Sequence, residues 1–204
     1  AVLPELIGTC KADADVPELK KNLLVICGSL NPISKQQIEY CEEMGFVRSV
    51  LSPEQLFEED YFSMEDGEQW LANLHKKLLE QQVLIIDSGI SQPEIMADYI
   101  NNIECDMDQV RFKISRNLGK LLAEFYKIKS GYETTVMIIG GDTLRGFIEA
   151  VDCDEINLVC EITMGTVLSK INVFGKSAQI ISKSGGFGNR ELIVDIAKRI
   201  LSDN

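Results

Sequence analysis

Short, continuous apolar runs that end at glycine are the feature that most constrains how this chain can fold. Four of them are LLVICGS (23–29), VLIIDSG (83–89), TTVMIIGG (134–141) and AQIISKSG (178–185). Apolar runs without polar alternation are typical of strands buried on both faces, as in parallel sheets. Between the runs lie segments with apolar residues at helical spacing. This alternation predicts an α/β fold, a layered helix–sheet–helix domain around a mostly parallel sheet.

Two weaker runs and six helical patterns complete the alternation. FVRSVL (46–51) and INLVCEI (156–162) predict two further strands. The helical patterns lie at 31–45, 67–82, 91–103, 107–128, 143–151 and 190–201. The acidic stretch 54–66 is interpreted as a solvated loop. No linker or repeat divides the chain, so residues 1–204 are predicted to form a single domain.

The first helical pattern carries signals at both ends. Pro32 suits a first helical turn, and Gly45 follows the last periodic residue. Ser34 and Gln37 have the spacing of a capping box, in which two side chains satisfy free amides at a helix start. We therefore expect both side chains to serve their own helix.

Charge and composition argue against several classes of function. The net charge of −12 argues against nucleic-acid or anionic-membrane binding through phosphate neutralisation. A small anionic ligand stays compatible with it, because local amides can hold a phosphate. No apolar stretch approaches the ~20 residues of a membrane span. The six cysteines show no metal-binding spacing, which favours buried, reduced thiols in a cytoplasmic protein.

The segments that follow the strands carry the candidate functional residues. Ligands of open α/β sheets bind beyond the carboxyl ends of the strands. Here those segments are CGSLNP, DSGISQP, GGDTLRG and SKSGGFGNR. Each combines glycine with serine or threonine, which suits a turn where backbone approaches a ligand closely.

The GGDT turn has the composition of an anion site. Gly140 and Gly141 permit a close approach of the backbone, and the helix that follows offers free amides. Thr143 adds a hydroxyl, and Asp142 suits either a helix cap or a metal-bound water. The alternative is an ordinary strand-to-helix turn capped by Asp142 or Thr143.

The last strand exit predicts a second phosphate-type loop. Gly185, Gly186 and Gly188 crowd one turn, and Lys183 supplies a positive charge. The alternative is a flexible turn before the last helix, with Asn189 as its cap.

Several familiar catalytic frames are missing from the sequence. It has no P-loop signature, no dinucleotide fingerprint and no G-x-S-x-G elbow. His75 is the one histidine and lies among lysines in a helical pattern. We interpret it as a structural surface residue, which argues against a histidine-based dyad or triad.

Three of these segments, in this order, resemble a known family. VICGSLNPISKQQ (25–37), GGDT (140–143) and KSGGFG (183–188) are similar to motifs in the C-terminal nucleotide-binding domain of the four-carbon acid sugar kinases. CEITMGTVLSKI (160–171) fits the family segment between the last two motifs. The resemblance covers the chain from about residue 22 to its end.

The resemblance implies an activity and a set of ATP contacts. Members of the family are ATP-dependent kinases of threonate, erythronate and related sugar acids, so ATP and Mg²⁺ are the implied cofactors. The residues that correspond to the family's ATP contacts are Ser29, Gly140, Gly141, Asp142, Thr143 and Gly185. Neither a catalytic residue nor a metal ligand is assigned.

This sequence departs from the family pattern in two ways. Gly186 replaces an asparagine that the last loop usually carries. The sequence also has no D-D-x-T-G-like motif, which belongs to the sugar-acid-binding N-terminal domain. Residues 1–21 look like the connection to such a domain. We therefore expect the ATP-binding half of a sugar-acid kinase, inactive alone, with that domain as its partner and a homodimer as one possible assembly.

Two alternatives stay open on the sequence. The chain fits a stand-alone nucleotide-binding or regulatory module without catalysis. It also fits a transferase of another type that shares only the layered fold, since fold does not fix function.

Overall fold

The strands form one sheet whose central members are parallel. In the computed structural model, which describes residues 18–89 and 106–202, the strand order is β2-β3-β1-β4-β7-β6-β5. The strands are β1 (Asn22–Cys27), β2 (Val47–Val50), β3 (Val83–Asp87), β4 (Thr134–Ile139), β5 (Ile156–Thr163), β6 (Thr166–Val173) and β7 (Lys176–Lys183). Neighbours from β2 to β7 pair in parallel, whereas β7, β6 and β5 form an antiparallel meander. The predicted fold class is confirmed.

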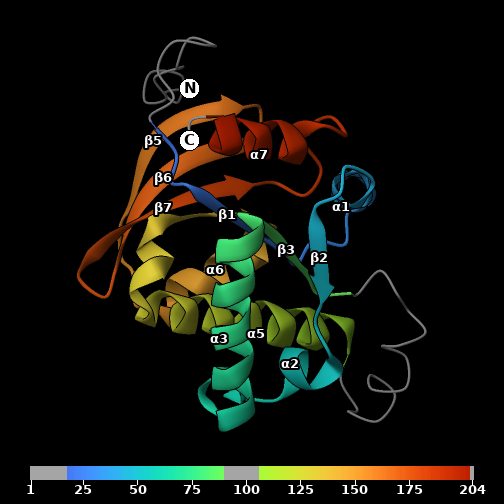
Figure 1. The fold of residues 1–204 in the computed structure, drawn as a ribbon. Coiled ribbons are helices and arrows are strands. Elements are labelled where there is room, and N and C mark those ends of the chain that lie inside the picture. The colour runs from blue at the N-terminus through green and yellow to red at the C-terminus, as the bar shows by residue number, and fades with distance from the viewer. Residues whose placement is uncertain (1–17, 90–105, 203–204) are drawn as a thin grey trace, which may run out of the picture.

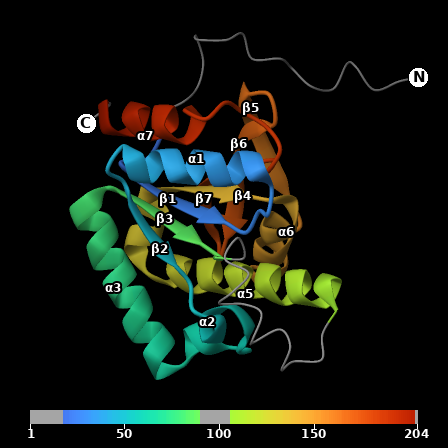
Figure 2. The same ribbon diagram turned by 90° about the vertical axis from the view of Figure 1, so that its right-hand side faces the viewer.

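Helices cover both faces of the sheet. On one face lie α1 (Pro32–Glu43) and α7 (Leu192–Ser202). On the other lie α3 (Glu65–Gln81), α5 (Met107–Lys127) and α6 (Gly141–Ala150) (Figures 1 and 2). Shorter elements are α2 (Pro53–Phe57) and the 3-10 turns Tyr61–Ser63 and Lys129–Glu133.

Two hydrophobic clusters, one on each side of the sheet, explain the continuous apolar runs. In β1, Leu24 and Ile26 pack into the cluster with α3, α5 and α6. Leu23 and Val25 point the other way, into the cluster with α1 and α7. Successive side chains of a strand face opposite sides of a sheet. Because each side of this sheet has its own core, β1 is buried from Leu23 to Cys27, and its polar residue, Asn22, lies at the partly exposed start of the strand.

One strand was not predicted from the sequence. β6 carries Ser169, Lys170 and Asn172 among its apolar residues, so it is neither a continuous run nor a strict alternation. It lies in the antiparallel part of the sheet, where solvent reaches Lys170 and Asn172. Antiparallel strands tolerate such polar positions, because they can expose one face to water.

The acidic stretch 54–66 is not the predicted loop. It contains α2 and a 3-10 turn, and its Leu56 and Phe62 are buried in the core. Ser52 and Gln55 form a capping box at the start of α2. These few apolar residues suffice to fold the segment, because they dock on a preformed surface that includes α5. The short helix predicted at 91–103 lies outside the described residues.

His75 is also not the surface residue predicted from its neighbours. Its side chain is 7% exposed, stacks on the Phe125 ring with centroids 4.4 Å apart, and has Nδ1 3.0 Å from Ser130 Oγ. Burial lowers the pKa of His75, which favours the neutral ring. The lysines beside it in sequence point to solvent, whereas His75 lies on the buried stripe of α3.

The described cysteines agree with the prediction of reduced thiols. All four are free, and three of them are buried: Cys27, Cys41 and Cys160. Across the described residues, no helix combines the length and the apolar character needed to span a bilayer.

Candidate functional site

The three strands that carry the motifs are adjacent in the sheet. β1 pairs with β4, and β4 pairs with β7, all in parallel. Their last residues are also level, because Cys27 pairs with Ile139 and Ile139 with Lys183. β2 and β3, the next two strands in the sequence, lie on one side of β1, whereas the later strands β4 and β7 lie on its other side. Such a reversal marks a topological switch point, where α/β domains bind ligands.

A cavity of about 310 Å³ lies at these strand ends. Its lining includes all six residues predicted as ATP contacts: Ser29, Gly140, Gly141, Asp142, Thr143 and Gly185. The remaining lining residues are Gly28, Leu30, Asn31, Arg111, Ile114, Ser115 and Gly186. The structure therefore brings together residues that are more than 150 positions apart in the chain.

Glycine allows the three loops to come this close. A Cβ atom on Gly28 would overlap Thr143 Oγ1, so glycine at position 28 lets the β1 exit contact α6. A Cβ atom on Gly185 would overlap Ser29 Oγ, so glycine at position 185 lets the β7 exit contact the β1 exit. The Ser29 hydroxyl also accepts a hydrogen bond from the amide of Asn31 at 3.2 Å.

The start of α6 is open to a ligand. Gly140, its N-cap residue, has φ +115° and provides no side-chain cap. Asp142 lies exposed in the first turn and makes no capping hydrogen bond among the described residues, so the alternative of a turn capped by Asp142 is wrong. The first amides of a helix have no partner within it, and the helix dipole favours an anion there. This end of α6 is therefore suited to a negatively charged group.

Lys183 does not take the predicted place beside a ligand. Its side chain is 2% exposed and is not part of the cavity lining. Nζ donates a hydrogen bond to the carbonyl of Ser184 at 2.9 Å. Burial lowers the pKa of Lys183 to about 8. Strand alternation explains this position, because Lys183 lies on the same face as Ile181, which packs against the α1 and α7 side.

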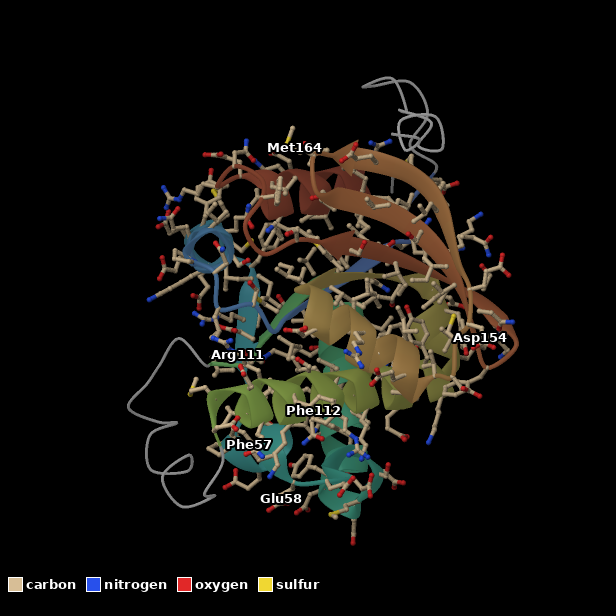
Figure 3. All side chains as sticks on the ribbon, turned by 180° about the vertical axis from the view of Figure 1, so that it is seen from behind. Phe57, Glu58, Arg111, Phe112, Asp154 and Met164 are labelled. Carbon is tan, nitrogen blue, oxygen red and sulfur yellow. The ribbon has the colours of Figure 1, made fainter. Side chains whose placement is uncertain are left out.

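Arg111 is the basic residue of the lining, and no sequence motif predicted it there. It comes from α5, and Figure 3 shows it near the N-terminal end of that helix. Its guanidinium is 3.6 Å from Asp108, whose side chain is 92% exposed. A helical pattern identifies the buried stripe of a helix but does not tell which exposed residue will border a cavity. No sequence signal therefore distinguished Arg111 from the other basic residues of α5.

The exit of β3, which carries the segment DSGISQP, does not contribute its described residues to the cavity. Asp87, the last residue of β3, forms an ion pair with Arg48 of β2. Neither residue lines the cavity. The described part of DSGISQP therefore joins two strands, and the rest lies outside the described residues.

The fold and the cavity define an α/β domain with a candidate site for an anionic ligand at its switch point. The chain belongs to the family of nucleotide-binding C-terminal domains, whose model matches residues 24–193. This assignment confirms the family resemblance drawn from the three motifs.

Solved structures of similar fold come from several bacteria. A Bordetella bronchiseptica protein of the DUF1537 family, a domain-swapped dimer with bound citrate, is 22% identical with a TM-score of 0.62; the match covers 88% of this chain and 39% of that one. A Haemophilus influenzae protein of the same family is 15% identical with a TM-score of 0.66, over 94% and 43% of the two chains. A Salmonella typhimurium LT2 protein provisionally described as a tRNA synthase is 14% identical with a TM-score of 0.62, over 88% and 41%.

These likenesses concern the fold. The chain spans about two fifths of the length of the solved structures that it matches. None of the curated protein sequences matches it significantly.

Proposed function

We propose that this chain is the ATP-binding half of a cytoplasmic kinase that transfers the γ-phosphoryl group of ATP to a hydroxyl of a four-carbon sugar acid of the threonate or erythronate type. The observation that carries the proposal is the meeting of three motif-bearing strand exits at one cavity beside the N-terminus of α6. The membership in a nucleotide-binding family supports the same ligand class.

The residues present suit ATP. A Cβ atom on Gly141 would meet open space, so the backbone there is accessible to a ligand. The first amides of α6 and the glycines of the β7 exit would hold phosphate oxygens, and Ser29 would add a hydroxyl. Arg111 would balance part of the phosphate charge. Asp142 is the carboxylate in the lining and would hold the hydrated Mg²⁺ that accompanies ATP.

Bound ATP supplies the phosphoryl group, and the acceptor must come from elsewhere. Phosphoryl transfer needs an acceptor hydroxyl held in line and a group that orients it. We assign those tasks to an N-terminal sugar-acid-binding domain of the kinase, consistent with the fraction of the solved structures that this chain spans. The dimeric, citrate-bound Bordetella protein is compatible with a homodimer that binds a hydroxy acid. Nucleic acid is not proposed as a substrate, because the net charge is −12.

Calorimetry with Mg-ATP and Mg-ADP tests the proposal. We expect both nucleotides to bind, and we expect no ADP release with threonate or erythronate from this chain alone. Absence of nucleotide binding would refute the ATP site, and sustained turnover would refute the division into two halves.

Two arginine variants test where the nucleotide binds. Arg111→Met removes the charge from the cavity lining and should weaken ATP binding about tenfold or more, since charge-assisted contacts contribute ~1.5–3 kcal/mol. The matched control is Arg145→Met. Arg145 lies on α6, is 75% exposed, pairs with Glu149 at 2.7 Å and does not line the cavity. Equal ATP affinities for the two variants would show that the nucleotide does not bind at this cavity.

A further inference from the structure

Four carbonyl groups of the loop 184–189 accept hydrogen bonds from buried side chains. Lys183 Nζ donates to the carbonyl of Ser184 at 2.9 Å, and Ser34 Oγ donates to the carbonyl of Gly185 at 2.8 Å. Gln37 Nε2 donates to the carbonyls of Phe187 and Asn189, at 3.2 and 2.7 Å. These bonds pull the loop toward α1.

Ser34 and Gln37 therefore do not form the capping box that their spacing predicted. Asn31 caps α1 instead, because its side-chain oxygen accepts from the amide of Ile33. Ser34 and Gln37 lie one helical turn apart on the buried face of α1, and both are 0% exposed. The hydroxyl and amide groups that could have served the helix face the β7 exit.

Because Ser34 and Gln37 are fully buried, their hydrogen bonds strongly favour one orientation of the loop carbonyls. A buried polar group that loses its partner carries a desolvation cost, so the Ser34 hydroxyl has one favourable arrangement, toward Gly185. The same cost applies to the amide nitrogen of Gln37, which is buried and has the loop carbonyls as its acceptors. The Oε1 atom of this side chain is buried without a partner in the described structure. The loop is thus fixed from the α1 side before any ligand arrives.

The geometry of the peptide bond carries this orientation to the cavity. In a trans peptide, the C=O and the following N–H point in opposite directions. Holding the carbonyls of Ser184 and Gly185 inward therefore turns the amides of Gly185 and Gly186 outward. Both glycines line the cavity. Within the part of the chain that the structure describes, their amides donate to no protein acceptor.

We propose that Ser34 and Gln37 are positioning residues for the nucleotide, which orient the 184–189 loop so that the amides of Gly185 and Gly186 bind a phosphate group of ATP. This inference rests on the proposed function. Successive amides that converge on one point form an anion-binding concavity. The first motif thus acts on the ligand through the last one, over a sequence separation of about 150 residues.

Ser34→Ala tests the proposal most directly. It deletes the donor to Gly185 without adding volume, so the fold should persist while the Gly185–Gly186 peptide loses its orientation. We expect the affinity for ATP to fall about tenfold in calorimetry. The affinity for adenosine, which has no phosphate, should stay unchanged when titrated by NMR. Gln37→Met, which keeps the length of the side chain and removes its donors, should give a similar selective loss.

An NMR signature separates positioning from general destabilisation. In the wild type, ATP should shift the amide signals of Gly185 and Gly186, and in Ser34→Ala these shifts should shrink. The matched control is Thr135→Val. Thr135 is 0% exposed and bonded to Gln179 Oε1 at 2.8 Å, and it lies near the other end of the sheet. It should lose stability without losing ATP affinity.

The outcomes are distinguishable. A wild type that binds no ATP refutes the proposed function and this inference with it. A wild type that binds ATP, with Ser34→Ala at equal affinity or with Thr135→Val equally weakened, refutes the inference alone. Parallel losses for ATP and adenosine also refute it, because they show that the variant disturbs more than the phosphate contact.

Discussion

Gly140 and Gly141 are neighbours in one turn, yet different physical demands fall on them. Gly140 has φ +115°, and its amide donates to the carbonyl of Lys183 at 3.0 Å. Side chains other than glycine are strained at such a φ. Gly141 starts α6 without a positive φ, and a Cβ atom there meets nothing within 4 Å. The fold thus requires Gly140, whereas no contact within the described structure requires glycine at position 141.

Gly141→Val is therefore expected to separate binding from folding. The added side chain would occupy space in the cavity without striking the protein, so thermal stability should stay near that of the wild type. ATP affinity should fall more than tenfold, or ~1.4 kcal/mol, and Gly141→Ala should give a smaller loss in calorimetry. A folded Gly141→Val protein with unchanged ATP affinity would show that no phosphate lies against this residue.

The buried Lys183 predicts a specific pH dependence of stability. Burial lowers its pKa to about 8 from an unfolded value of 10.5. Between these values the unfolded chain holds a proton that the folded protein lacks, so stability rises with pH across this window. Cys27 nearby has the opposite effect above pH 9, because burial raises the pKa of its thiol from 9.0 to about 12; a comparison of two proteins that both keep Cys27 isolates the contribution of Lys183.

Urea unfolding of the wild type and Lys183→Met between pH 7 and 10 measures this effect. The wild type should gain stability relative to the variant above pH 8, with a slope of at most ~1.4 kcal/mol per pH unit. Parallel stability curves for the two proteins would mean that the Lys183 ammonium stays hydrated.

At the scale of elements, the packing of α5 against α6 determines where the start of α6 lies. A Cβ atom on Gly119 would overlap the carbonyl of Gly146, and one on Gly146 would overlap the carbonyl of Ser115. These two glycines bring the helix backbones into contact. Because α6 begins at the cavity and α5 carries Arg111, this contact also sets one wall of the site.

Gly146→Ala should therefore destabilise the protein, although alanine favours helices by ~1 kcal/mol over glycine. The methyl group forces two backbones apart, and such overpacking costs ~1–3 kcal/mol. We expect a lower urea midpoint and weaker ATP binding. Gly141→Ala, the same substitution in the same helix but facing open space, should not lower the urea midpoint. Equal midpoints for the two variants would contradict the close helix contact.

Patterns in the sequence predicted elements well where burial is two-sided. β3 and β4 lie inside predicted runs, and β1 and β7 begin one and two residues before theirs. A strand segment with a core on each side is largely apolar, which makes it visible in the sequence. β6 and α2 were missed, because each depends on docking against a surface that another part of the chain builds. The same limit applies to Ser34 and Gln37, whose spacing signalled a cap while their partners lie about 150 residues away.

At the scale of the whole molecule, the site joins segments that only the folded chain brings together. A ligand that binds the native state alone stabilises it by ~2.7 kcal/mol at one hundred times its Kd. We expect the urea midpoint to rise steadily with ATP concentration. The midpoint of Gly141→Val should respond much less over the same range. A midpoint that does not move for wild type would argue against native-state ATP binding.

The sequence predicted where the cavity lies, but it predicted only part of the cavity's lining. The rule that ligands bind at the carboxyl ends of parallel strands selected the strand exits, and the family resemblance selected Ser29, Gly140 and Gly185 within them. The structure places these three residues at one cavity. Arg111 and the inward position of Lys183 depend on how helices and strands rotate as they pack. No local pattern in the sequence encodes that rotation.

The order of the strands has a consequence for how the protein folds while it is being synthesised on the ribosome. β1 and β4 are synthesised before β7, yet β7 supplies the third side of the cavity and is the last strand of the described chain. A nascent chain that has emerged only as far as α6 already has two of the three loops, but no complete cradle. Nucleotide binding would therefore begin only once β7 has joined the sheet, so that nucleotide occupancy would report on the folding of β7.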